Sequence, residues 1–133
     1  MIDRESVLFA NHRFYLAFDQ HDLAAMATLW AQHNPVICIH PGWPALTDRD
    51  AIMQSWEQIL ANVQAPAIRQ HHEQVLLYAK LACVVCYEQA GDNQLVAVNA
   101  FVEEEGDIRM VQHQAGNCVN APAAQPRAKV SVQ

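Results

Sequence analysis

The sequence lacks most of the features that would take it out of the class of ordinary globular domains. No apolar run approaches the roughly 20 residues that a membrane-spanning helix needs. With only four glycines, the chain has no glycine-rich phosphate loop, and it contains no internal repeat and no G-x-S-x-G nucleophile motif. Hydrophobic residues make up 52% and charged residues 17% of the 133 positions, which predicts one globular domain with a proper core.

Positive charge is also scarce. Eight lysines and arginines stand against fourteen aspartates and glutamates, which gives a net charge of −6, and no basic cluster interrupts this acidic balance. Because phosphate backbones are bound by basic surfaces, nucleic acid is excluded as a partner. The first five residues are polar and acidic and do not form a secretion signal, so we expect a cytoplasmic protein that no membrane holds.

Two of the four cysteines have the spacing of a CxxC motif, but their setting argues against redox chemistry or zinc. Cys83 and Cys86 lie in an apolar, β-branched run that is typical of a strand. Residues three apart point to opposite faces of a strand, so these sulfurs cannot hold one metal. We expect buried, reduced thiols at all four positions, Cys38, Cys83, Cys86 and Cys118.

Seven histidines are many for this length, yet their spacing sets up no pair of neighbouring metal ligands. Neither HxH nor HExxH occurs, and the adjacent His71 and His72 are expected to point to opposite faces of a strand. We therefore predict no metal site and no cofactor. One alternative stays open, in which three histidines meet in space: His40, His72 and His113.

Hydrophobic periodicity predicts three helices in the first half of the chain. Asp3 and Asp22 are expected to cap the first two, and Thr47 forms a capping box with Asp50 at the start of the third. The second helix is expected to end at Asn34-Pro35, because proline disfavours helix in the residue before it. The expected helices cover residues 3–18, 22–34 and 48–62.

Strands are predicted on both sides of the third helix. A short strand over 36–40 precedes it, and four long strands follow, over residues 68–78, 81–89, 95–103 and 108–118. The short turns between the four long strands are typical of antiparallel hairpins, and the Glu103-Glu104-Glu105 run is expected to be a solvated hairpin tip. The predicted fold class is α+β, with a curved antiparallel sheet packed on three N-terminal helices around a small pocket.

The middle strands are apolar at nearly every position, as in Cys83-Val84-Val85-Cys86-Tyr87, and do not alternate with polar residues. Both faces of the sheet are therefore expected to be covered. The helices cover one face, and we predict that a second copy of the chain covers the other, in a homodimer through the sheet. Residues 1–118 form the domain, and residues 119–133, which have no periodicity, are expected to be a flexible tail.

Several segments spread over residues 3–116 share the pattern of a known superfamily. They are Phe14-Tyr15-Leu16-Ala17-Phe18, Asp22-Leu23, Leu29-Trp30-Ala31, Cys38-Ile39-His40-Pro41-Gly42-Trp43-Pro44, Asp50-Ala51-Ile52 with Trp56, Asn99-Ala100-Phe101, and Arg109-Met110-Val111-Gln112-His113. In these segments the chain resembles the nuclear-transport-factor-2-like superfamily and, within it, a SnoaL-like branch with a His-Pro-Gly segment.

The resemblance implies a cystatin-like fold of the α-β(2)-α-β(4) type, in which a cone-shaped sheet and the helices enclose a pocket. Members of the superfamily include ketosteroid isomerases, polyketide cyclases, dehydratases and epoxide hydrolases, and also non-catalytic binding and association domains. Membership of the fold therefore does not name an activity.

Three positions can be compared with the ketosteroid isomerases in this superfamily. His40-Pro41 matches the Asp-Pro pair whose aspartate is the general base, and Asn99 matches a protonated aspartate that donates to the oxyanion. Phe14 matches the tyrosine donor, with Tyr15 one step along the helix. Histidine can still act as a base and asparagine can still donate, but phenylalanine cannot donate, so the steroid isomerase mechanism is not supported.

A catalytic trio of His40, Asn99 and His113 is the site hypothesis that survives this comparison. His113 is expected to share the pocket-facing side of the last strand with Arg109, Val111 and Ala115, beside Asn99 on the neighbouring strand. His40 would act as base or acid, with Asn99 and Tyr15 orienting a carbonyl. The alternative is purely structural, with a hydrogen-bonded histidine at a strand end, an asparagine in a bulge and a satisfied core histidine.

Aromatic side chains are expected to line an apolar cavity for a small apolar ligand, or else to form the core. Trp43 is the best candidate for a rim contact, because two prolines hold it outside regular structure. The full expected set is Phe14, Tyr15, Phe18, Trp30, Trp43 and Trp56.

Two functions are consistent with these residues. One is a small-molecule pocket with isomerase-, cyclase- or dehydratase-like acid–base chemistry through His40. The other is a non-catalytic binding or dimerisation module of the same fold. The retained polar trio favours the first, whereas the missing tyrosine donor and the absence of a carboxylate at the base position favour the second, so the sequence leaves open whether the chain is an enzyme.

Overall fold

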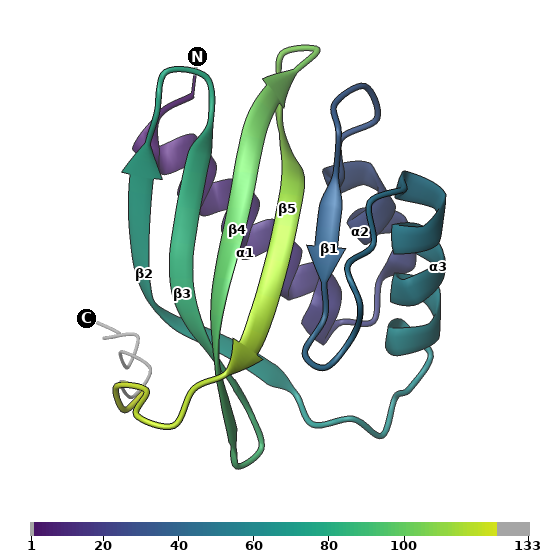
Figure 1. Ribbon diagram of the computed structural model, residues 1–133, viewed down its shortest axis with the longest axis vertical. Helices are drawn as coiled ribbons and strands as arrows, with labels where there is room; N and C mark the ends of the chain where they lie inside the picture. Colours follow the sequence, from purple (N-terminus) through teal and green to yellow (C-terminus); the bar gives the residue numbers. More distant parts are fainter. Residues whose placement is uncertain (1, 125–133) are drawn as a thin grey trace, which may run out of the picture.

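The computed structural model describes residues 2–124, in which three helices and five strands follow the order α1-α2-β1-α3-β2-β3-β4-β5 (Figure 1). The helices are Arg4–Asp19 (α1), Leu23–Leu29 (α2) and Arg49–Leu60 (α3), and the strands are Ile37–Ile39 (β1), Ile68–Leu77 (β2), Ala82–Ala90 (β3), Asn93–Glu104 (β4) and Asp107–Asn117 (β5). The predicted α+β class is confirmed. Most of the expected tail over 119–133 lies outside the described residues.

Aspartates cap all three helices. Asp3, Asp22 and Asp48 each accept a hydrogen bond from the backbone N–H three residues further on, at 2.8, 3.0 and 3.1 Å. These bonds satisfy amides that have no partner inside the helix. The expected cap at Thr47 is therefore wrong by one residue, because Asp48 takes the capping position.

The second helix is shorter than the periodicity predicts, because the chain leaves it at Trp30 and not at Asn34. Trp30 has extended backbone angles (φ −71°, ψ 139°) and forms a bridge with Met110 of β5. The amide of Ala31 then donates to the carbonyl of Met110 at 2.9 Å. The fully buried Trp30 thus enters the core on strand-like backbone, which helical spacing cannot reveal.

The strands form one sheet in the order β1-β5-β4-β3-β2. The four long strands are antiparallel neighbours, as predicted, but β1 runs parallel to β5, so the sheet is mixed. The α-β(2)-α-β(4) type has two strands between the first helices and α3. In this chain the second of them is reduced to a single bridge between Cys38 and Leu46. Helix α1 crosses one face of the sheet and packs on β2, β3 and β5 (Figure 1).

A bulge in β5 changes which of its residues face the helices. Ala100 pairs with Gln112 and Phe101 pairs with Met110, so Val111 is an extra residue on β5. Met110 and His113 are consequently both buried on the helix side. The expectation that Arg109 faces the pocket is wrong.

A second bulge lies in β2, where the pairing with β3 jumps from His71 to Gln74. His72 has φ 54°, in the left-handed region, and this turns its ring toward that of His71. The two Nδ1 atoms are 2.6 Å apart, so the expectation that these histidines point to opposite faces is also wrong.

Along the strands, residues that face the helices alternate with residues on the outer side of the sheet. In β3 the buried residues are Ala82, Val84, Cys86 and Glu88, and the residues between them are half-buried. Cys38 and Cys86 are buried thiols as expected, whereas Cys83 and Cys118 are only partly buried. No helix within residues 2–124 has the length and hydropathy to span a membrane.

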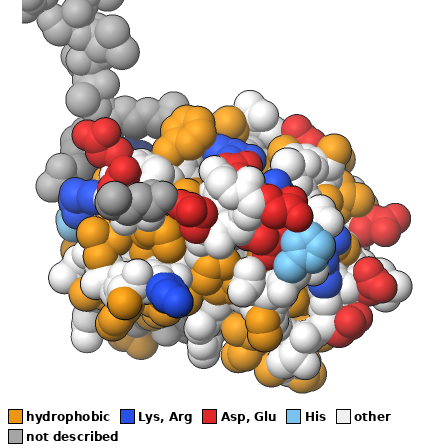
Figure 2. All heavy atoms as spheres, turned by 90° about the horizontal axis from the view of Figure 1, so that it is seen from above, with side chains coloured by type: hydrophobic (Ala, Val, Ile, Leu, Met, Phe, Trp, Pro, Cys, Tyr) orange, Lys and Arg blue, Asp and Glu red, His pale blue; other side chains and the backbone are white. Residues whose placement is uncertain are grey.

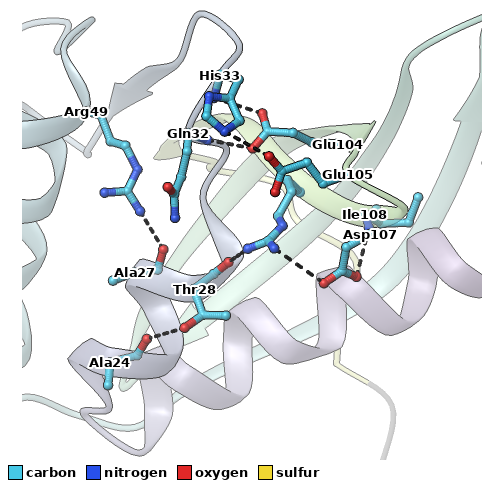
Figure 3. Close-up of polar contacts among 11 residues, drawn as sticks. Ala24, Ala27, Thr28, Gln32, His33, Arg49, Glu104, Glu105, Asp107 and Ile108 are labelled. Atoms are coloured by element: carbon cyan, nitrogen blue, oxygen red, sulfur yellow. Dashed lines mark hydrogen bonds and ion pairs between the residues drawn. The ribbon is translucent and has the colours of Figure 1, made fainter.

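One end of the molecule is held by a buried carboxylate at the end of β4. Glu104 accepts hydrogen bonds from the amides of Gln32 and His33, at 2.8 and 3.0 Å (Figure 3). The side chain of Asn34 donates to it as well, at 2.9 Å. Burial raises the pKa of Glu104, but the hydrogen bonds from these three donors together lower it by more. The pKa of Glu104 therefore lies below its ordinary value. Glu104 is therefore not part of a solvated tip.

Two arginines close the same end. Arg49 of α3 donates to the carbonyl of Ala27 at 2.6 Å (Figure 3). It also donates to the carbonyl of Ala31 at 3.2 Å, and Arg109 donates to the carbonyl of Thr28. These donors satisfy carbonyls at the end of α2. Seen from outside, this end mixes acidic, basic and hydrophobic side chains and does not form a patch of one sign (Figure 2).

We expect Glu104→Gln to lower the free energy of unfolding by about 1–2 kcal/mol at pH 7, because an amide replaces the carboxylate that three donors address. The neighbouring Glu105 contacts His33 with both side chains largely exposed, so Glu105→Gln should change stability by less than about 0.5 kcal/mol. Urea unfolding of both variants measures the difference. Equal effects would contradict the anchoring role of Glu104.

Candidate functional site

A pocket of about 250 Å³ lies where the end of α1, the loop after β1, α3 and the sheet meet. Its walls are mostly apolar, and three ionisable side chains reach it. The lining residues are Phe18, His40, Pro41, Trp43, Ile59, Ile68, Glu88, Ala90, Leu95 and His113.

His40 follows β1 and is 4% exposed. Its Nε2 is 2.9 Å from the Ser55 hydroxyl of α3, and that hydroxyl donates its own proton to the carbonyl of Ile52 at 2.6 Å. Ser55 must therefore accept from Nε2–H, which leaves the lone pair of His40 on Nδ1. Burial lowers the pKa of His40 to about 4, so the ring is neutral at neutral pH.

His113 stands beside it on β5, with 6.2 Å between the two ring centroids. Its Nδ1 is 2.6 Å from Oδ1 of Asn99, the residue directly opposite on β4. Because an amide oxygen only accepts, Nδ1 of His113 carries the proton and Nε2 carries the lone pair. Burial, and to a lesser degree the charge of a protonated His40, lower the pKa of His113 to about 3.

Asn99 does not line the pocket. It is fully buried, and its Nδ2 donates to Oδ1 of Asn11 at 2.9 Å and to the hydroxyl of Tyr15 at 3.1 Å. The predicted trio is thus divided in the structure. His40 and His113 reach the cavity, and Asn99 orients His113 from behind.

Glu88 is the ionisable pocket residue that sequence reasoning missed. It is 2% exposed, and its Oε2 accepts from the Tyr15 hydroxyl at 2.5 Å. Burial raises the pKa of Glu88 to about 7, even though the Tyr15 hydrogen bond acts in the opposite direction. A signal was present, because Glu88 is the one charged residue in phase with the inward-facing Ala82, Val84 and Cys86.

Tyr15 is buried and bonds with Glu88 behind the pocket, and the other aromatic residues expected at the ligand site divide into two groups. Phe18 and the half-buried Trp43 line the pocket. Phe14, Trp30 and Trp56 are fully buried in the core and do not line this pocket. Phe14 and Trp56 still shape the site from behind, since Phe14 packs on His113 and Trp56 packs on His40, with ring centroids 4.7 and 4.8 Å apart.

The meeting of three histidines does not occur. His72 packs beside Tyr87 on the outer side of the sheet, away from His40 and His113. Within residues 2–124, no group of three or more histidine, cysteine, aspartate or glutamate side chains is placed to hold a metal ion.

Comparison with known proteins places the chain in a family. Residues 7–118 match the family model described as the SnoaL-like domain. The chain belongs to the SnoaL-like domain family. No curated protein matches the sequence.

Solved structures share the fold of this SnoaL-like chain. A candidate dehydratase of the nuclear-transport-factor-2-like family from Streptomyces avermitilis is 26% identical, with a TM-score of 0.76 over 87% of this chain and 96% of that one. A candidate calcium/calmodulin-dependent protein kinase type II association domain from Thiobacillus denitrificans is 25% identical, with a TM-score of 0.75 over 82% and 92%.

A third structure, from Nostoc punctiforme, is described as having a cystatin-like fold. It is 11% identical and has a TM-score of 0.72 over 90% of this chain and 94% of that one, so it bears on the fold alone. The predicted superfamily, group and cystatin-like fold are confirmed by these matches.

We expect the free energy of unfolding of Glu88→Gln to increase relative to that of wild type as the pH rises. Folded Glu88 keeps its proton up to a pKa of about 7, whereas the unfolded glutamate loses it near 4.5. Wild type therefore loses stability between these values, because a buried group becomes charged, and the variant does not. The difference in unfolding free energy should grow by on the order of 2–3 kcal/mol between pH 4 and pH 8.

Urea unfolding at a series of pH values measures this difference, and the pH dependence of the two buried histidines cancels because both proteins contain them. Glu105→Gln, at an exposed position, serves as the control and should show no such trend. A difference between Glu88→Gln and wild type that is constant with pH would contradict the raised pKa of Glu88.

Proposed function

We propose that the chain binds a small, neutral, largely apolar ligand in this pocket and carries out acid–base chemistry on it through His40. The observation that supports this most is the convergence of His40, His113 and Glu88 on one cavity with apolar walls. Perturbed ionisable groups in a concave apolar site are the usual mark of a working site.

The charges of the pocket favour a neutral ligand. Both histidines are neutral at pH 7, and the lining residues include no lysine or arginine. A carboxylate or phosphate would enter an apolar space without a cationic partner, which is unfavourable. The volume of about 250 Å³ lies just below the roughly 300–1,000 Å³ of most ligand pockets, so the ligand is compact.

The tautomer of His40 supports its role as the proton acceptor. Ser55 holds the Nε2–H and leaves Nδ1 with a lone pair, and the low pKa keeps that lone pair free across the neutral range. Isomerisation, cyclisation and dehydration can each begin when a base removes a proton from a carbon atom of the ligand. The similarity to the candidate dehydratase from Streptomyces avermitilis supports the same class of chemistry.

The alternative is a binding or dimerisation module, and the similarity to the candidate association domain from Thiobacillus denitrificans favours it. Assembly of two chains through the sheet is compatible with both functions, the acid–base pocket and the binding or dimerisation module. The outer side of β3 and β4 presents half-buried apolar pairs, Val85 opposite Val98 and Tyr87 opposite Val96. We propose that a second copy of the chain covers this side.

Sedimentation equilibrium at micromolar concentration should give a dimer for wild type. Val98→Glu should give a monomer, because it places a charge in the centre of the covered side. The matched control is Val63→Glu, at an exposed position after α3, which should stay dimeric. A wild-type monomer would contradict the homodimer.

Cyclohexanone in D₂O serves as the probe of acid–base chemistry, because exchange of its α-protons requires proton removal beside a carbonyl. Wild type should accelerate the exchange above the buffer rate, measured by ¹H NMR. His40→Asn keeps a donor for Ser55 but removes the base, so the acceleration should fall at least tenfold. His33→Asn, at a largely exposed histidine, is the control and should behave as wild type.

Two results separate the alternatives. Exchange at the buffer rate with cyclohexanone bound in the pocket, seen as shifts of the Trp43 indole signal, would leave a binding module. Acceleration that survives His40→Asn would remove His40 from the chemistry.

A further inference from the structure

We infer that Glu88 is a catalytic residue of this pocket, and that it donates a proton from Oε1 to a hydroxyl or carbonyl oxygen of a neutral ligand. The inference rests on the proposed function, which it extends by naming the acid that complements His40 and the ligand group that both address.

Four buried side chains form a hydrogen-bonded chain that ends at Glu88, and the amide group of Asn99 fixes the direction of two of its three bonds. Nδ1–H of His113 donates to Asn99, Nδ2–H of Asn99 donates to the hydroxyl of Tyr15, and that hydroxyl donates to Oε2 of Glu88. The first two directions follow from the amide group of Asn99, since an amide oxygen cannot donate and an amide nitrogen cannot accept. The hydroxyl of Tyr15, which accepts from Asn99, donates its own proton to the carboxylate oxygen Oε2. Glu88 is the acceptor at the end of the chain.

This direction decides which carboxyl oxygen carries a proton. Oε2 already accepts from Tyr15, so the proton of a neutral Glu88 belongs on Oε1. Among residues 2–124, Tyr15 is the only hydrogen-bond partner of the Glu88 carboxyl group. Because Glu88 lines the pocket, Oε1–H is left for a ligand.

The other polar groups of the pocket cannot take this role. His40 and His113 have both given their N–H to protein acceptors, Ser55 and Asn99, and keep only lone pairs for a ligand. The indole N–H of Trp43 can form a hydrogen bond but cannot transfer its proton. Without Glu88 the pocket would have bases but no acid.

The proton balance closes for a ligand with a hydroxyl group. His40 Nδ1 takes a proton from carbon, the electrons of that C–H bond form a double bond, and the C–O bond breaks as the oxygen takes the proton of Glu88 and leaves as water. His40 is then cationic and Glu88 anionic. A proton that passes from His40 to Glu88 through solvent restores both groups.

His40 and Glu88 can act on a ketone in the same way. Removal of the α-proton by His40 and protonation of the carbonyl oxygen by Glu88 give the enol, and return of a proton to carbon gives exchange or isomerisation. The pKa of about 7 suits Glu88 to this task, because a useful fraction of it is protonated at neutral pH.

Three probes with the same six-membered ring and different head groups test the assignment. Cyclohexanone offers an acceptor oxygen, cyclohexanecarboxylate is an anion, and cyclohexylammonium is a cation. Binding of each to wild type and to Glu88→Gln is measured by NMR titration between pH 6 and pH 8. Glutamine keeps the shape of the side chain and an N–H donor, but it cannot transfer a proton.

For wild type we expect cyclohexanone to bind about tenfold more weakly at pH 8 than at pH 6, because the protonated fraction of a group with a pKa of about 7 falls by about that factor. Glu88→Gln should bind cyclohexanone with no pH dependence. It should nevertheless lose at least tenfold of the α-proton exchange, while the exposed control Glu105→Gln loses none.

Three results would overturn the inference while the proposed function stands. They are cyclohexanone binding that does not change with pH in wild type, full exchange activity in Glu88→Gln, and cyclohexylammonium binding that strengthens with pH and depends on Glu88, which would make the residue an anionic anchor. Failure of the proposed function has a different signature, in which no probe enters the pocket of either protein, and it removes the inference as well.

A measurement without any ligand tests the hydrogen-bond chain. In protein labelled with ¹³C at glutamate carboxyl carbons, one signal should titrate near pH 7 and be missing from Glu88→Gln. Tyr15→Phe should move that titration to higher pH, because the Tyr15 hydroxyl stabilises the charged form. A titration that stays in place in Tyr15→Phe would overturn the chain.

Discussion

Burial of a polar chain between α1 and the sheet is the constraint on which the rest of the structure depends. Asn11 and Tyr15 come from α1, Glu88 from β3, Asn99 from β4 and His113 from β5. In an apolar interior each of these groups would be costly without a partner, so the helix has little freedom to slide or rotate over the sheet. The same bonds that fix the register of α1 also fix the tautomer of His113 and the free oxygen of Glu88.

Much of the fold follows from the sequence because its causes are local. Capping aspartates start the helices, and short polar turns join β2, β3, β4 and β5, so the element order is legible in the residues. The errors arise where tertiary contacts decide. Trp30 leaves its helix to bridge Met110, and the bulge at Val111 reverses the facing of Arg109. Neither effect has a periodic signature.

The site was predictable only in part, for the same reason. The strand end at His40 and the pairing of Asn99 with His113 follow from the order of the strands. The pKa of Glu88 does not, because it depends on burial and on a hydroxyl 73 residues away. Tyr15 was expected to face a ligand, and in the structure its hydroxyl bonds with the carboxyl group of Glu88, which lines the pocket.

The separation of these partners has a consequence for how the protein folds. Asn11 bonds with Asn99 across 88 residues, and Tyr15 bonds with Glu88 across 73, so the site has a high contact order. During synthesis α1 leaves the ribosome long before its polar partners exist, and until then water must satisfy Asn11 and Tyr15. Closure of the sheet over the helix removes that water in one step. The pocket should therefore form with the final cooperative folding event, and no N-terminal fragment should contain it.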